Sequence, residues 1–246
     1  MLTMQLSQAV YDIPAIDFFA QSVVTNTTFI GAYRGAGRPE ATQMVERVLD
    51  KAAAAIGMDP AEIRRKNYLQ PDAFPLTTLV GANYDSGEYE RSLDAVLEAS
   101  GYSELRAEQT RRRETNDPML LGIGVSSYVE VTAPIGLHVE YGSCEINDDG
   151  SATIKVGTSS HGQGHDTAFS MLVNDVLGIP MDQVNHVDAD TETVARGSGT
   201  MGSRSLQAGG SAVYEASKVV LEKGKQLAAT LLEASADDIV VGDGAL

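Results

Sequence analysis

Two glycine- and serine-rich loops in the second half of the chain carry the residue types most suited to binding chemistry. The first contains residues 161–165 (His-Gly-Gln-Gly-His), and the second covers residues 196–205. Glycine allows the backbone to approach a ligand closely, and the N–H groups at a helix start attract anions and phosphates. Both loops run straight into a helical pattern. Together they favour a flat, phosphorylated ligand.

The histidines of the first loop stand four residues apart, as metal ligands on a helix do. However, glycines lie between His161 and His165, no glutamate occupies the general-base position of a zinc protease, and no third ligand is evident. The spacing therefore predicts no metal site. A ligand-binding loop and a purely structural histidine both stay open.

The second loop contains Gly197-x-Gly199-x-x-Gly202, which matches the dinucleotide-binding fingerprint. The context differs from that fingerprint, because residues 191–196 are polar rather than a buried strand and the expected βαβ unit is missing. A nucleotide-phosphate-binding module therefore stays only as an alternative.

A narrower interpretation concerns residues 202–205 (Gly-Ser-Arg-Ser) alone. At a helix start they offer backbone N–H groups, two hydroxyls and a guanidinium, which together suit a phosphate. The alternative is that Ser203 or Ser205 only caps the helix.

A third loop lies early in the chain, where Arg34 and Arg38 flank a Gly-Ala-Gly turn between an expected strand and an expected helix. The two arginines could bind an anionic ligand. The glycines could equally serve only a tight turn. Spacing alone leaves both interpretations open.

Composition narrows the class of protein. The chain has 246 residues and a formal net charge of −16, which argues against a nucleic-acid partner because such proteins carry a basic stripe. Cys144 is the only cysteine, so the chain builds no disulfide, zinc knuckle or iron–sulfur cluster by itself. No run of about 18 apolar residues and no signal-peptide pattern occur, so we expect a cytoplasmic protein without a membrane span.

Hydrophobic periodicity predicts an α+β fold of two mixed regions. For the first region we expect strands at 15–25 and 28–33 and helices at 39–56, 60–68, 89–99 and 103–115. For the second we expect strands at 121–131, 138–146, 152–156 and 184–187, a hairpin turn at 147–150, and helices at 167–177 and 205–234. Asn-Asp-Pro at 116–118 breaks the pattern, so we place the domain boundary near residue 116, giving domains 1–116 and 117–246.

Three motifs, taken in order, make the chain recognisable. They are residues 31–40 (GAYRGAGRPE), residues 161–165 (HGQGH), and residues 199–205 (GTMGSRS) with 209–214 (GGSAVY). In this order they resemble the molybdopterin-binding large subunits of the xanthine dehydrogenase, aldehyde oxidase and carbon monoxide dehydrogenase family. The likeness covers nearly the whole chain, so the two regions resemble parts of the two molybdopterin-binding domains of that family.

The resemblance implies a molybdenum hydroxylase, which oxidises a small molecule such as an aldehyde or an N-heterocycle with oxygen derived from water. By position, Arg34 lies beside the molybdenum, Ala36 faces the substrate, and Gln163 hydrogen-bonds the pterin. The residues that the resemblance assigns to cofactor binding are Arg34, Gly35, Gly162, Gln163, Gly164, His165, Thr200, Gly202, Ser203, Arg204 and Ser205. The cofactor implied is molybdopterin cytosine dinucleotide or plain molybdopterin.

Two positions depart from particular family members. Carbon monoxide dehydrogenases resemble this chain around Arg34 but carry a copper-binding cysteine where this chain has Gly35. We therefore expect no copper–molybdenum site and no carbon monoxide oxidation. Xanthine-oxidising relatives stack a phenylalanine on the substrate where this chain has Ala36, so purines are not expected as substrates.

Length is the last departure, since family large subunits are much longer and their general-base glutamate has no counterpart in these 246 residues. We therefore nominate no catalytic residue and expect a fragment spanning the end of the first molybdopterin-binding region and the start of the second. The resemblance implies an iron–sulfur small subunit with 2Fe–2S clusters and a flavin (FAD) medium subunit, in a homodimer of heterotrimers. A remnant that folds without cofactor is the alternative.

Overall fold

The computed structural model describes residues 2–29, 31–133, 136 and 139–242. The chain divides into two compact units, Met1–Glu130 and Val131–Leu246, and each is described by itself. The division lies later than the boundary expected near residue 116. The segment after the helix α5 (Tyr102–Glu114) packs on the first unit. There Val125 and Val129 contact the core of this unit, and the Ser127 hydroxyl lies 2.6 Å from the Tyr68 hydroxyl.

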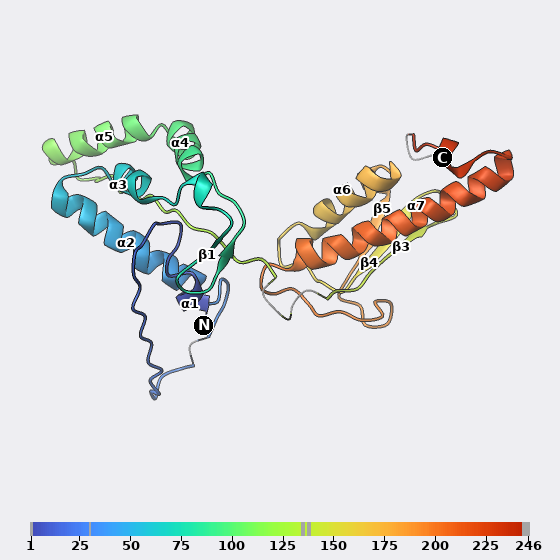
Figure 1. Ribbon diagram of the computed structural model, residues 1–246, viewed down its shortest axis with the longest axis horizontal. Helices are drawn as coiled ribbons and strands as arrows, with labels where there is room; N and C mark the ends of the chain where they lie inside the picture. The colour runs from blue at the N-terminus through green and yellow to red at the C-terminus, as the bar shows by residue number, and fades with distance from the viewer. Residues whose placement is uncertain (1, 30, 134–135, 137–138, 243–246) are drawn as a thin grey trace. The chain divides into compact units, whose positions relative to one another are not determined.

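Unit 1 is mainly helical, as Figure 1 shows. Its helices are α1 (Leu2–Gln5), α2 (Arg38–Ile56), α3 (Pro60–Asn67), the 3-10 turn η1 (Pro71–Ala73), α4 (Tyr89–Ser100) and α5 (Tyr102–Glu114). Its strands β1 (Leu76–Thr77) and β2 (Asn83–Tyr84) pair antiparallel. The four helices expected for this region are therefore confirmed.

Local sequence signals explain where the long helices begin and end. Pro39 occupies the first turn of α2, where its missing N–H costs nothing, and Gly57 ends that helix in a left-handed conformation with φ 67°. Asp59 caps α3 by accepting a hydrogen bond of 2.8 Å from the backbone N–H of Ala61. These signals mark the start and the end of α2 and the start of α3.

A buried ionic network holds the centre of unit 1. The Glu46 carboxylate accepts hydrogen bonds from the Tyr11 hydroxyl, from Arg64 Nε at 2.7 Å and from the Ser127 backbone N–H at 3.0 Å. The Arg64 side chain is fully buried. Tyr11 also stacks on Tyr68 with 5.7 Å between ring centroids. The network thus ties α2, α3 and the segment around Ser127 to one core.

The expected strands at 15–25, 28–33 and 121–131 are wrong, since no strand forms in the described residues of these ranges; residue 30 lies outside them. Val24 is 97% exposed and Tyr33 is fully exposed. Strand propensity acts through packing against a neighbouring strand. Without such a neighbour in the described structure, these β-prone residues form no strand.

Buried tyrosines give unit 1 a pH dependence. Burial raises the pKa of Tyr84 to about 12, and burial with the Glu46 hydrogen bond raises the pKa of Tyr11 as well. Above pH 10 the unfolded state loses these protons first, so we expect the free energy of unfolding to fall as pH rises from about 10 to 12, by on the order of 2 kcal/mol for Tyr84 alone. Urea unfolding at pH 8, 10 and 11 measures this. In Tyr84→Phe the fall in the free energy of unfolding with pH must become smaller. An unchanged pH dependence in this variant contradicts the raised pKa of Tyr84.

Unit 2 is a three-stranded sheet with two helices on one face (Figure 1). Its elements are β3 (Gly142–Ile146), β4 (Ala152–Val156), α6 (His165–Leu177), the 3-10 turn η2 (Met181–Gln183), β5 (Val184–Val187), the π-helical turn η3 (Ser205–Gly210), α7 (Ser211–Leu232) and the 3-10 turn η4 (Ala236–Asp238). The strand order is β3-β4-β5, with β3 antiparallel and β5 parallel to β4.

The core of unit 2 follows from alternation along β4. Ala152, Ile154 and Val156 are fully buried and form one cluster with Phe169 of α6 and Val213 of α7. The two strands, the helix and the hairpin turn expected over 147–187 are confirmed. The strand expected from residue 138 begins at Gly142, and residue 138 lies outside the described part.

The long C-terminal helix is also confirmed, but its first turn differs from the expectation. Residues 205–210 form the π-helical turn η3, and α7 follows it. Within the described residues, no helix combines the length and apolar character needed to cross a membrane.

Candidate functional site

The two glycine-rich loops of unit 2 leave the same edge of the sheet. The first follows β4 at Gly157 and leads into α6, and the second follows β5 at Asp188 and leads to η3. Because β4 and β5 are parallel, their carboxyl ends meet at one edge, where ligands bind in many α/β proteins. This β4–α6–β5 unit, which the sequence analysis missed, explains why the two loops converge.

The loops touch through their glycines. The Gly199 N–H donates to the Gly157 carbonyl at 3.2 Å. A Cβ atom added to Gly197 would lie 2.5 Å from the Gly157 carbonyl oxygen and 2.6 Å from its Cα. Only glycine permits this close backbone approach.

Thr200 joins the loops a second time. Its hydroxyl accepts a hydrogen bond from the Ser159 backbone N–H at 2.9 Å and donates to the Ser159 carbonyl at 2.6 Å. The Ser205 hydroxyl lies 3.3 Å from the Thr200 hydroxyl oxygen. Thr200 and Ser205, both expected in the cofactor site, thus lie side by side at the junction of the loops.

A buried ion pair between Arg204 and Glu140 holds the second loop. The Arg204 guanidinium binds the Glu140 carboxylate, the Gly199 carbonyl at 2.6 Å and the Val139 carbonyl at 2.5 Å. Both charged side chains are fully buried. The guanidinium is therefore engaged by protein groups, and the interpretation that it is presented to a phosphate has no support in this geometry.

Glu140 was missed by sequence reasoning. It lies 64 residues before Arg204, and its carboxylate also accepts from the backbone N–H groups of Tyr141 at 2.8 Å and Ser198 at 3.2 Å. No local spacing signals such a partner. Only the fold brings the two charges together.

Two residues near the end of the second loop have left-handed backbone conformations. Gly202 and Ser203 have φ values of 58° and 54°, and Ser203 is one of few non-glycine residues in this left-handed region. The N-cap positions of η3 and α7, Arg204 and Gly210, make no side-chain cap hydrogen bond. Strained residues and π-helical turns both concentrate at functional sites.

The first loop exposes its central residues. Residues 161–164 are exposed, and a Cβ at Gly162 or Gly164 would meet nothing within 4 Å. Gln163 accepts from the His161 backbone N–H through its side chain. The N-terminus of α6, which begins at His165, has no side-chain cap among the described residues. An open glycine loop before an uncapped helix start suits an anionic group.

His165 is the unexpected member of this loop because it is buried. Its ring packs 5.1 Å from Phe169, and within the described chain neither ring nitrogen has a hydrogen-bond partner. Burial lowers the pKa of His165, with the neighbouring His186 adding to the effect. Buried polar groups are nearly always hydrogen-bonded, so a missing partner here indicates a group outside this chain. The described residues contain no cluster of three ligating side chains for a metal ion.

Arg34, Gly35 and Ala36 belong to unit 1. Arg34 and Ala36 are exposed, and the backbone has positive φ at Gly35 (92°), Ala36 (50°) and Gly37 (101°). The Gly35 carbonyl accepts a hydrogen bond of 3.0 Å from the Arg38 guanidinium. Arg38 is thus engaged within the turn, while Arg34 extends from it. Whether Arg34 and Ala36 face a cofactor and substrate stays a prediction.

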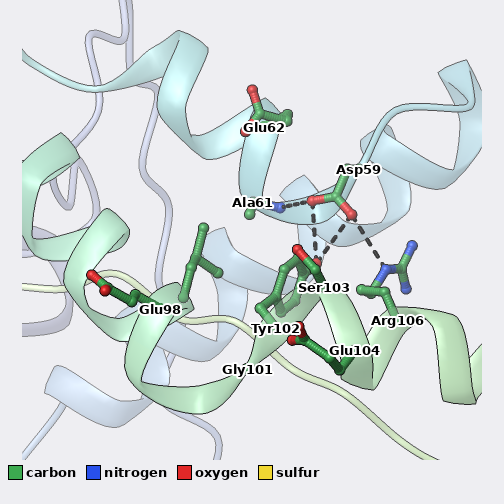
Figure 2. Close-up of a pocket in the computed structure, with 10 residues that line it drawn as sticks. Asp59, Ala61, Glu62, Glu98, Gly101, Tyr102, Ser103, Glu104 and Arg106 are labelled. Carbon is green, nitrogen blue, oxygen red and sulfur yellow. Dashed lines mark hydrogen bonds and ion pairs between the residues drawn. The ribbon is translucent and has the colours of Figure 1, made fainter.

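Unit 1 also contains an acidic hollow of about 680 Å³ between α3, α4 and α5, shown in Figure 2. Its central carboxylate, Asp59, accepts from Ala61, from the Tyr102 hydroxyl at 3.1 Å and from Arg106 Nε at 3.3 Å. The Ala61 contact caps α3 and the other two join it to α5, so Asp59 has a structural role here.

Comparison with known proteins matches this chain to one family. A model described as "Molybdopterin cofactor-binding domain" matches residues 95–246, and a second model of the same description matches residues 1–68. The carbon monoxide dehydrogenase large chain of Hydrogenophaga pseudoflava is 38% identical over 242 residues, which is 93% of this chain and 30% of the relative. The nicotine 6-hydroxylase large subunit of Paenarthrobacter nicotinovorans is 36% identical over 96% of this chain and 30% of the relative.

Solved structures agree. Quinoline 2-oxidoreductase from Pseudomonas putida 86 superposes with a TM-score of 0.84 and 33% identity, covering 97% of this chain and 31% of that chain. This chain therefore spans less than a third of the relatives it matches. The resemblance drawn from the three sequence motifs is confirmed, and the chain belongs to the molybdopterin cofactor-binding family of xanthine dehydrogenase and carbon monoxide dehydrogenase large subunits.

Proposed function

We propose that unit 2 holds the molybdopterin cofactor of a molybdenum-dependent oxidoreductase at the loops that follow β4 and β5. The observation that carries the proposal is His165, a buried imidazole without a partner in the described chain, at the uncapped start of α6. A polar ligand seated there satisfies both the imidazole and the N–H groups of the first turn.

The residues fit the group in complementary ways. Gly162, Gln163 and Gly164 offer backbone and amide groups on an open surface, whereas Thr200 and Ser205 lie where the two loops join. Ser203 and Gly202 contribute the strained turn before η3, and Arg204 acts on this turn through Glu140. When bound, the cofactor supplies the redox centre for oxidising a substrate carbon with oxygen from water.

We further propose an N-heterocycle or aldehyde as the substrate rather than carbon monoxide. Two matched proteins are named for nicotine and quinoline, both N-heterocycles. Gly35 stands where the family's copper-binding cysteine is expected, and Ala36 leaves space on the proposed substrate side. The family resemblance assigns Arg34 to the metal, and the proposal keeps this assignment.

The proposed assembly is a cytoplasmic complex with an iron–sulfur small subunit and a flavin medium subunit, paired as a homodimer of heterotrimers. Several matched relatives are named as large chains or subunits, which supports partner subunits. The proposed cofactor form is the cytosine dinucleotide.

Molybdenum content tests the proposal. The chain is purified from a cofactor-producing cytoplasm, and molybdenum per polypeptide is measured by plasma mass spectrometry. Near-stoichiometric metal is expected. Negligible metal contradicts the proposal that this chain holds the cofactor by itself, and it favours the alternative of a remnant without cofactor.

A matched pair of variants separates charge from shape. In Gly162→Asp a carboxylate faces the proposed anionic ligand, whereas Gly162→Asn places a neutral side chain of the same size at the same position. The φ of 100° strains the backbone of both variants, so the two are compared with each other and not with the wild type. Because like charges repel by several kcal/mol at contact distances, we expect Asp to lower molybdenum content about tenfold relative to Asn. Equal content in both variants would place the anionic groups elsewhere.

A further inference from the structure

The carboxyl end of β5 holds the first loop at two points. His186 Nδ1 hydrogen-bonds Asp166 Oδ1, just after the loop enters α6. The Asp188 carboxylate accepts a hydrogen bond of 3.1 Å from the Ser160 backbone N–H, just before the exposed stretch 161–164. The stretch that carries Gly162, Gln163 and Gly164 is therefore fastened on both sides by one strand.

The chemistry of the pair fixes the roles of the His186 ring nitrogens. An ionised carboxylate only accepts hydrogen bonds, so Nδ1 carries the proton that is donated to Asp166. The other nitrogen, Nε2, is buried and lies 4.0 Å from the Asp188 carboxylate. The ring stands edge-on to Phe169 with centroids 5.4 Å apart. The Asp166 hydrogen bond and the Phe169 contact thus hold the His186 ring in one orientation.

The loop has reason to need this fastening. Gly162 and Gly164 have φ values of 100° and 77°, and glycine loses more conformational freedom on ordering than any other residue. A loop already held in its binding conformation loses less entropy when a ligand arrives. Supporting residues that orient ligand-binding groups act in this way in many sites.

We propose that His186 and Asp188 are positioning residues that hold residues 160–166 in the conformation that receives the molybdopterin cofactor. This proposal rests on the proposed function. Neither residue is assigned to the cofactor itself, and both act through the loop.

Hydrogen exchange of the cofactor-free full chain tests the fastening directly. Loop amides of residues 158–166 are compared in the wild type, His186→Leu, His186→Asn and Asn185→Ala. Asn carries its amide nitrogen on Cγ, as His carries Nδ1, so it restores the donor to Asp166 without the ring. Asn185 is the matched control, because it is exposed on the same strand.

We expect His186→Leu to speed loop exchange roughly fivefold, His186→Asn to restore it, and Asn185→Ala to leave it unchanged. Asp188→Ala should likewise speed exchange of the Ser160 amide, and Asp188→Asn, which keeps an oxygen acceptor, should restore its protection. Identical exchange in His186→Leu and the wild type overturns the proposal. Failure of Asn to restore protection also overturns it, since the ring would then only fill space.

Molybdenum content of the same variants, prepared in cofactor-producing cells, separates this inference from the proposed function. Lower metal in His186→Leu that returns in His186→Asn supports the link between loop position and cofactor. Faster exchange with unchanged metal overturns that link. Absence of metal from the wild type counts against the proposed function alone, because the exchange contrast needs no cofactor.

Discussion

Replacing Glu140 with alanine is expected to lower the free energy of unfolding of unit 2 by about 3–5 kcal/mol. The change leaves the Arg204 guanidinium buried without its carboxylate, and it also removes the acceptor for the Tyr141 and Ser198 N–H groups. Hydrogen exchange of the slowest amides in β4 and α7 measures this free energy, because these elements form the core of the unit.

Two comparisons sharpen this prediction. Glu140→Gln keeps the shape and loses the charge, so its effect should lie between those of the wild type and the alanine variant. Glu215→Ala removes an exposed pair with Lys218 and should cost no more than about 0.5 kcal/mol. If Glu140→Ala costs as little as Glu215→Ala, then the buried pair does not stabilise the second loop.

The helices of this chain could be predicted from sequence because their signals are local. Pro39 and Gly57 mark the ends of α2, and Asp59 caps α3, all within a few residues of the helix they define. The β4 strand could also be predicted, because its alternation of apolar and polar residues places Ala152 and Ile154 on the buried face. Such patterns need no knowledge of distant contacts.

The strands at 15–33 and 121–131 were mispredicted because a strand is defined by its partner. Val24 and Phe19 have high strand propensity, yet they are 97% and 84% exposed. Composition alone reports the preference of a residue for a pleated surface and not whether such a surface is present.

The candidate site was predictable only in part. The loops at 161–165 and 196–205 were identified from their glycine content. The parallel pairing of β4 and β5, which brings the two loops together, was not predicted. Glu140 and His186 carry no motif, because their roles arise from contacts with Arg204 and Asp166 that only the fold creates. Burial likewise changed the interpretation of Arg204 from a ligand-binding group to a support.

Replacing Gly197 with alanine is expected to separate the two loops. The new Cβ would overlap the backbone of Gly157, which cannot rotate away as a side chain can. We therefore expect a loss of about 3 kcal/mol in the free energy of unfolding of unit 2, together with loss of molybdenum. Gly199→Ala is the matched control, because its nearest atom is Met201 Cε at 3.6 Å and only its φ of 81° opposes alanine, at about 1 kcal/mol. Hydrogen exchange and metal content are measured on both variants. Equal losses would contradict this prediction, because Gly197 has no left-handed φ and only its close contact with the Gly157 backbone opposes alanine there.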